Sequence, residues 1–163
     1  MHVALPPVAA APRSAGSPRR PAPPVAAVLS LGAAWVHLAY ATAHFRQWWA
    51  YGVFFLATGA GQALFAPLIL RWPRPALAAV GIVGNLAIVA MYVLSRTNGA
   101  PLGPHAHVIE PVGTVDLATA AAEVLLICVL VSVLGPRARR RVADLLVAAG
   151  VFVWALRLSG HLP

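Results

Sequence analysis

Five apolar runs, each close to the length of a membrane-spanning helix, dominate the sequence. They cover residues 25–45, 50–70, 76–95, 115–134 and 142–158. A helix needs about 20 mostly apolar residues to cross the hydrocarbon core of a bilayer. The fifth run is the shortest, begins near Asp144 and ends at Arg157, so an interfacial or re-entrant helix remains the alternative there. We therefore predict an all-α transmembrane helical bundle of five spans. Four of them form the core, and whether the fifth crosses the membrane is left open.

The composition excludes the other broad classes of protein. The chain of 163 residues is 60% hydrophobic and only 10% charged, whereas soluble domains are about 45–50% apolar and about 25% charged. This leaves too little polar surface for a water-soluble globule, and too much apolar surface for a disordered chain. Cys128 is the single cysteine, which excludes a disulfide scaffold. An integral membrane protein in a lipid bilayer is the class that remains.

The basic residues indicate how the chain is oriented. All 12 are Arg, and with 4 acidic residues they give a net charge of +8. The segment before the first run, the four loops and the segment after the fifth run carry 3, 1, 2, 1, 4 and 1 Arg, so alternate segments hold 9 on one side and 3 on the other. Cytoplasmic segments carry the excess of Arg. We predict a multi-pass protein of the cell (cytoplasmic) membrane, with its N-terminus in the cytoplasm and its C-terminus outside.

The first 24 residues differ from the rest of the chain. They contain seven Pro and three Arg, which predicts a disordered cytoplasmic tail over residues 1–24, ahead of a transmembrane domain over residues 25–163. The basic tail, the first apolar run and Ala41-Thr42-Ala43 also resemble a signal peptide with a cleavage site. The run is longer than the apolar region of a typical signal peptide and contains Trp35 and Tyr40, so we favour an uncleaved first helix.

Two ionisable residues occur in the first run and two in the fourth. His37 and His44 are seven residues apart, as are Asp116 and Glu123. Seven residues make two helical turns, so each pair shares one helix face over about 10 Å. In the predicted topology, His44 and Asp116 lie near the outer boundary, and His37 and Glu123 lie deeper. If the two helices pack together, two His–carboxylate pairs stack at matching depths.

The second and third runs each add one strongly polar residue at mid-depth. These are Gln62 and Asn85, whereas Asp144 of the fifth run lies near the cytoplasmic side and does not join them. Hydrogen bonding between helices is the structural explanation for such residues, at about 0.6 kcal/mol each. Ionisable residues within a membrane are functional candidates by default. The expected polar intramembrane layer consists of His37, His44, Gln62, Asn85, Asp116 and Glu123.

The third loop suggests a metal site as one further candidate. A His-x-His pair with carboxylates suits Zn or Cu(II), and the candidate ligands are His44, His105, His107, Glu110 and Asp116. The alternative is a solvated loop that contains two histidines. His37 and His44 cannot share one metal ion, because ligand bonds are only about 2 Å long. Haem is disfavoured, because both membrane histidines belong to one helix.

Arg96 and the Arg residues of the fourth loop have other expected roles. We expect Arg96, at the outer end of the third run, to pair with Glu110 or Asp116 and pin the loop over the mouth of the bundle. The fourth loop is expected to set topology and to bind anionic lipids through Arg137, Arg139, Arg140 and Arg141. A nucleic-acid partner is disfavoured, because the chain has no nucleic-acid-binding fold.

One stretch of the chain resembles a known group of proteins. It contains His37, His44, Trp48-Trp49, Gly52, Phe55 and Gln62, then Ser95-Arg96-Thr97-x-Gly99-x-Pro101-x-Gly103-Pro104, then Glu110-Pro111-x-Gly113-x-x-Asp116 and Glu123. This pattern resembles uncharacterised small polytopic integral membrane proteins of high-GC bacteria. The resemblance covers about half of the chain and implies a class of protein without an activity.

These observations lead to two function hypotheses. The first is a membrane protein that handles protons, a metal ion or a small solute through the outer-half His/carboxylate layer. The second is a non-catalytic accessory or assembly subunit, or a homo-oligomer, that packs through small-residue faces such as Gly59 with Gly61 and Gly81 with Gly84. An enzyme ranks third, because the chain has no phosphate loop, nucleophile elbow or HExxH motif.

Overall fold

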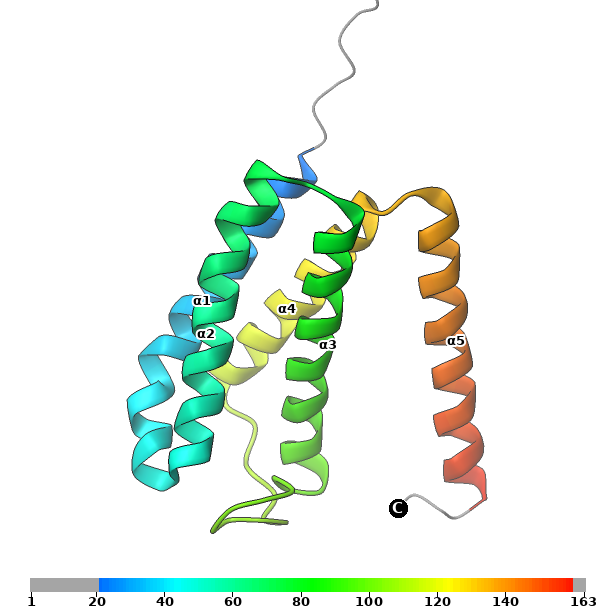
Figure 1. Cartoon of the computed structure of the whole chain (residues 1–163). Coiled ribbons are helices and arrows are strands. Elements are labelled where there is room, and N and C mark those ends of the chain that lie inside the picture. The colour runs from blue at the N-terminus through cyan, green and yellow to red at the C-terminus, as the bar shows by residue number, and fades with distance from the viewer. Residues whose placement is uncertain (1–20, 160–163) are drawn as a thin grey trace, which may run out of the picture.

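The computed structural model describes residues 21–159, which form five helices joined by short connections and one longer loop (Figure 1). They are α1 (Ala22–Gln47), α2 (Trp49–Arg71), α3 (Pro75–Thr97), α4 (Thr114–Val133) and α5 (Pro136–Leu158). The predicted all-α helical bundle is confirmed. Most of the predicted tail, residues 1–20, lies outside the described residues, as do residues 160–163.

Helices α1 to α4 form a closed four-helix bundle. α1 packs along α2, α2 touches α3, α3 packs on α4, and α4 returns to α1. One end of the bundle, here called the turn end, holds the start of α1, the α2–α3 turn and the end of α4. The opposite end, called the loop end, holds the connection between α3 and α4, residues 98–113 (Figure 1). The packing of α1 on α4 is the condition on which the predicted His–carboxylate pairs depend.

The prolines explain where several helices begin. α1 starts at Ala22, so the last three residues of the predicted tail are helical instead. Pro23 and Pro24 occupy its first turn, where the missing backbone N–H has no helical partner to lose. α3 likewise begins at Pro75. Between α1 and α2 a single extended residue, Trp48, turns the chain back on itself.

The bundle buries several polar side chains while many large apolar side chains face outward. Val28, Trp35 and Val83 are 70%, 75% and 67% exposed, whereas the buried side chains include Ser30, His37, Gln62, Asn85 and Glu123. Water would not favour this distribution, but lipid would, since large apolar side chains can face acyl chains. Four described helices, α1 to α4, are long and apolar enough to cross a membrane. The chain thus has the architecture of a multi-pass membrane protein.

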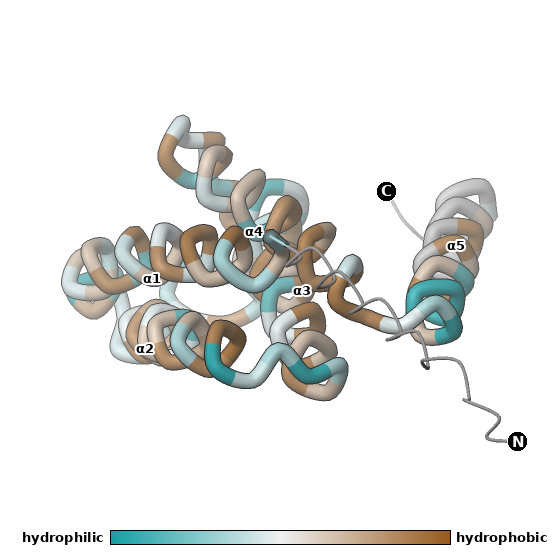
Figure 2. The backbone as a smooth tube through the Cα atoms, turned by 90° about the horizontal axis from the view of Figure 1, so that it is seen from above, coloured by the Kyte–Doolittle hydropathy of each residue, from teal (hydrophilic) through white to brown (hydrophobic). Residues whose placement is uncertain are grey.

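The fifth helix differs from the prediction. α5 begins at Pro136, so the four Arg expected in a loop lie in its first turns, and Arg157 lies inside the helix. Pro favours the first position of a helix and Arg is a good helix former, which explains the extension. α5 is not among the described helices that are apolar enough to span. Among the described residues it contacts only α4, and it stands apart from the bundle with a hydrophilic start (Figures 1 and 2).

The apolar core fills the turn end of the bundle. Its buried residues come from the start of α1, the end of α2, the start of α3 and the end of α4, and include Ala26, Phe65, Ile69, Ile82, Leu126 and Leu130. Gly81 lets α3 approach closely, because a Cβ there would lie 2.6 Å from Phe65 Cζ and 2.7 Å from Leu130 Cδ1. Polar residues in the middle of the bundle are therefore sealed from the turn end.

Candidate functional site

Gln62 is the hub of the buried polar cluster. Its Nε2 lies 3.2 Å from Asn85 Oδ1 and 3.3 Å from Glu123 Oε1. Asn85 Nδ2 donates to the carbonyl oxygen of Gly81 at 2.7 Å, so its side-chain oxygen must face Gln62. Gln62 can then only present its amide N–H groups to both neighbours. The Gly81 carbonyl can only accept a hydrogen bond, so it fixes the orientation of the Asn85 amide and, through it, that of the Gln62 amide.

His37 completes the cluster from α1. Its Nε2 lies 3.7 Å from Glu123 Oε1, and the two residues are 5% and 1% exposed. His37 Nδ1 lies 2.9 Å from the carbonyl oxygen of Ala33, which can only accept a hydrogen bond, so Nδ1 carries a hydrogen. Nε2 is therefore the ring atom left to exchange a proton with Glu123. The structure brings together His37, Gln62, Asn85 and Glu123, one from each helix of the bundle.

The pair formed by His37 and Glu123 has two arrangements with the same net charge. With one proton between Nε2 and Oε1, it is either a neutral carboxyl beside a neutral imidazole or a carboxylate beside an imidazolium. Both arrangements are neutral overall, which suits an apolar surrounding. Uptake or loss of one further proton leaves a net charge inside the bundle. A shift of the proton within the pair therefore leaves its net charge unchanged.

One polar atom of the cluster has no partner. Gln62 is only 6% exposed, and its Oε1 is buried and accepts no hydrogen bond within the described structure. A buried carbonyl oxygen without a donor costs about 1–3 kcal/mol. Gln62 Oε1 can therefore accept a hydrogen bond from one further donor, such as a water molecule, a hydronium ion or an N–H or O–H group of a solute.

Ser30 is a member of the cluster that the sequence analysis missed. It is fully buried, and its Oγ donates to the backbone carbonyl of Gln62 at 2.7 Å. This bond ties α1 to α2 beside the hub. The spacing could have revealed it, because Ser30, His37 and His44 follow one another at intervals of seven residues on one face of α1.

The predicted pair of His44 and Asp116 does not form. His44 Nδ1 donates to the carbonyl of Tyr40 at 2.9 Å, and the ring stacks on Phe55 with centroids 3.5 Å apart. Phe55 also contacts His37, at 5.4 Å between centroids. Asp116 instead pairs with Arg96, whose permanent charge makes it a stronger partner than a histidine. Phe55 separates the outer histidine from the buried one.

Arg96 binds both carboxylates that the sequence analysis offered as alternatives. Nη2 lies 2.8 Å from Asp116 Oδ2, and Nη1 contacts Glu110 Oε2. Nη1 also donates to Ser95 Oγ at 2.8 Å. The Arg96 side chain is 13% exposed, whereas the two carboxylate side chains are 44% and 43% exposed, so water reaches the carboxylate side of the ion pair. It joins α3, the loop of residues 98–113 and the start of α4.

Two further contacts hold the loop against the bundle. Tyr51 on α2 donates from its hydroxyl to the carbonyl of Leu102 at 2.7 Å, and Glu110 N–H donates to the carbonyl of Ser95 at 3.1 Å. Gly103 has φ of +103°, and a Cβ there would lie 2.6 Å from the Tyr51 hydroxyl oxygen and 2.8 Å from Trp48 Cε3. A glycine is thus needed for the loop to lie this close to the α1–α2 junction.

The expected metal ligands are not brought together. Among residues 21–159, no three His, Cys, Asp or Glu side chains are placed to hold one metal ion. His105 and His107 are exposed on the loop, while the two candidate carboxylates are held by Arg96. His44 stacks on an aromatic ring. Ion pairing and stacking engage three of the five candidate ligands separately, so the described structure does not assemble them into one site.

No family model, curated protein or solved structure matches the chain. The resemblance to small polytopic membrane proteins of high-GC bacteria therefore stays a prediction.

Proposed function

We propose that this membrane protein binds and releases a proton at the pair formed by His37 and Glu123, as a carrier that couples proton movement to a small polar solute would. The observation that carries the proposal is the distance of 3.7 Å between His37 Nε2 and Glu123 Oε1, inside a bundle that buries both side chains. The hydrogen bond from His37 Nδ1 to Ala33 leaves Nε2 as the exchanging atom. Gln62 Oε1 offers an acceptor to the solute or to water.

The surroundings give the site a direction. The apolar core closes the turn end, so the proton reaches the pair from the loop end, past Phe55 and His44. The loop held by Arg96 covers that entrance. We place the loop end outside the cell and the turn end in the cytoplasm, because the turn end carries the excess of Arg. Release to the cytoplasm then requires the helices to part around the apolar core.

Proton flux into proteoliposomes tests the proposal. Purified protein is reconstituted with a trapped pH-sensitive dye, and a potassium gradient with valinomycin drives protons inward. Glu123→Gln keeps an acceptor oxygen facing Gln62 but cannot exchange a proton, so we expect the flux to fall at least tenfold. Asp144→Asn is the matched control, because Asp144 is exposed on α5, outside the cluster. Its flux should equal that of the wild type.

Two outcomes would contradict the proposal. The first is wild-type flux no greater than that of empty liposomes, both in buffer alone and with a panel of small polar solutes. The second is equal flux in the wild type and in Glu123→Gln. An infrared difference spectrum recorded across a pH change gives a second measurement, since a protonated carboxyl band that Glu123→Gln removes identifies the group.

The alternative of an accessory subunit rests on the small-residue faces. Gly59 is used inside the bundle, where a Cβ would lie 2.7 Å from Leu38 Cγ, and Gly81 is used in the same way. Gly61 and Gly84 face open space, so only they remain for a partner helix. This supports the subunit role less directly than the buried pair supports proton handling. A partner that co-purifies with the wild type but not with Gly84→Leu would favour it.

A further inference from the structure

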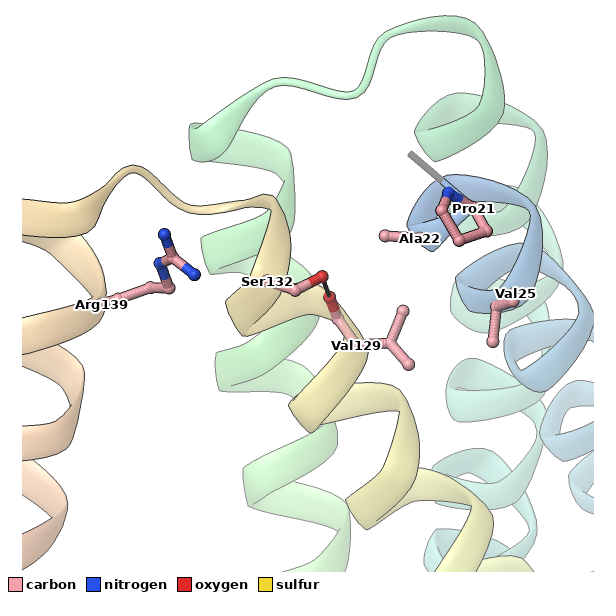
Figure 3. A pocket seen from close by; sticks show the side chains of 6 residues that line it. All are labelled: Pro21, Ala22, Val25, Val129, Ser132 and Arg139. Carbon is pink, nitrogen blue, oxygen red and sulfur yellow. Dashed lines mark hydrogen bonds between the residues drawn. The ribbon is translucent and has the colours of Figure 1, made fainter. Parts of the chain in front are cut away.

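A hollow of about 430 Å³ lies at the turn end, outside the polar cluster. Three elements enclose it: the start of α1, the last turns of α4 and the first turns of α5. Figure 3 shows Arg139 reaching toward α4 from α5, with the start of α1 on the opposite side. The lining residues are Pro21, Ala22, Val25, Val129, Ser132 and Arg139.

The lining has a charged part and an apolar part. Arg139 has no carboxylate partner within the described residues, so its guanidinium offers its donors to a ligand. Val25 and Val129 form the apolar wall. That wall continues along α1 and α4 into exposed apolar side chains such as Val28 and Leu125, which are 70% and 51% exposed. A ligand that fits both parts has an anionic head and a long apolar tail.

The position of the hollow also suits a lipid headgroup. Five further Arg lie at the same end of the molecule, and none of them has an ion-pair partner among residues 21–159; they are Arg71, Arg74, Arg137, Arg140 and Arg141. Trp72, 49% exposed, lies between α2 and α3 at this end, as residues of an interfacial aromatic belt do. Basic clusters at this level attract anionic headgroups.

We propose that this hollow binds one anionic phospholipid. Its phosphate accepts hydrogen bonds from the Arg139 guanidinium, which is suited to bidentate contact with phosphate. Its acyl chain lies along Val25 and Val129, where free phosphate would leave the apolar wall uncovered. Because α5 touches the bundle only through α4, the lipid also fills the space between α5 and α1 and holds α5 against the bundle.

Native mass spectrometry of the full chain in detergent tests this site with phosphatidylglycerol as the probe. We expect Arg139→Ala to weaken binding at least fivefold relative to the wild type. Arg140→Ala is the matched control, because it removes the same charge from the next residue but does not line the hollow. Its affinity should stay within about twofold of the wild type. Equal weakening in the two variants would mean diffuse attraction to the Arg cluster and would overturn the proposal.

Three further arms test the lipid itself. Val25→Trp fills the apolar part of the hollow and should weaken phosphatidylglycerol binding without altering any charge. Phosphatidylcholine should bind at least fivefold more weakly than phosphatidylglycerol, and glycerol 3-phosphate should not compete. Equal binding of the two lipids, competition by glycerol 3-phosphate or undiminished binding to Val25→Trp would each contradict the proposal. If Arg139→Ala fails to fold, the wild-type lipid preference and Val25→Trp decide.

Discussion

Phe55 lies between the two histidines of α1 and contacts both rings. Its side chain comes from α2, and its ring stacks on His44 and lies tilted against His37. An aromatic ring offers no hydrogen-bond donor or acceptor between the two imidazoles, so we expect it to slow proton transfer between them. If the buried pair exchanges protons as proposed, we expect Phe55 to limit access to it without taking part in the exchange.

Replacing Phe55 with Ala should raise proton flux in proteoliposomes several-fold. The smaller side chain leaves space for water between two polar rings, and water enters cavities that offer it polar partners. Phe54→Ala is the control, since Phe54 contacts Phe55 but neither histidine ring within the described structure. A flux that is unchanged or reduced in Phe55→Ala, with a normal melting temperature, would show that the ring does not control access.

At the scale of elements, Arg96 joins two helices and the loop of residues 98–113. We expect Arg96→Ala to release the loop, because it leaves Glu110 and Asp116 without their cation. Hydrogen bonds to charged groups contribute about 1.5–3 kcal/mol each. The carboxylate side chains are 44% and 43% exposed, so water screening reduces the expected loss to about 1–2 kcal/mol, or roughly five- to thirtyfold in the ratio of closed to open loop.

Limited proteolysis of reconstituted protein measures this release. Arg96→Ala should be cut within the loop at a rate higher by that factor, and Arg96→Lys should lie in between, because Lys cannot contact two carboxylates with a planar fork. Thr97→Ala is the control, since the Thr97 hydroxyl bonds only to α3 and the adjacent Asn98. Equal cleavage of Arg96→Ala and the wild type would mean that Tyr51 and the backbone contacts hold the loop by themselves.

The helical elements and their depths were predictable from the sequence, and their side-chain partners only in part. Hydropathy determines the four core helices, and the seven-residue spacing with alternating topology brings His37 and Glu123 to the same depth. The pairing of His44 with Asp116 failed, because Arg96 competes for the same carboxylate. The donor role of Gln62 depends on which backbone carbonyl is left for Asn85, and the sequence does not contain that information.

At the scale of the whole molecule, the two ends of the bundle are unlike. The turn end combines an apolar core with unpaired Arg, whereas the loop end combines the entrance to the polar cluster with a neutralised Arg96. By the positive-inside rule, the excess of Arg at the turn end predicts that this end faces the cytoplasm. The orientation is therefore a prediction about the whole molecule that thiol labelling can check.

Single thiols map this orientation in a background where Cys128, exposed on α4, is replaced by Ala. Leu102→Cys in the loop should react with a membrane-impermeant maleimide on intact cells, since Leu102 is 67% exposed. Gly135→Cys, between α4 and α5, should react only after the membrane is opened. Gly135 tolerates a Cβ, which would meet no atom within 4 Å. The reverse pattern of labelling would invert the proposed orientation.

The single residue between α1 and α2 has a consequence for how the protein is made. With only Trp48 as a connection, we expect the two helices to enter the bilayer together as one hairpin. His37, Gln62 and the bond from Ser30 are then in place before the ribosome has translated α4. Glu123, the most costly residue to insert, arrives last, when its hydrogen-bonding partners are already in the membrane. On this expectation, the order of synthesis shields the buried carboxyl group of Glu123 from bare lipid.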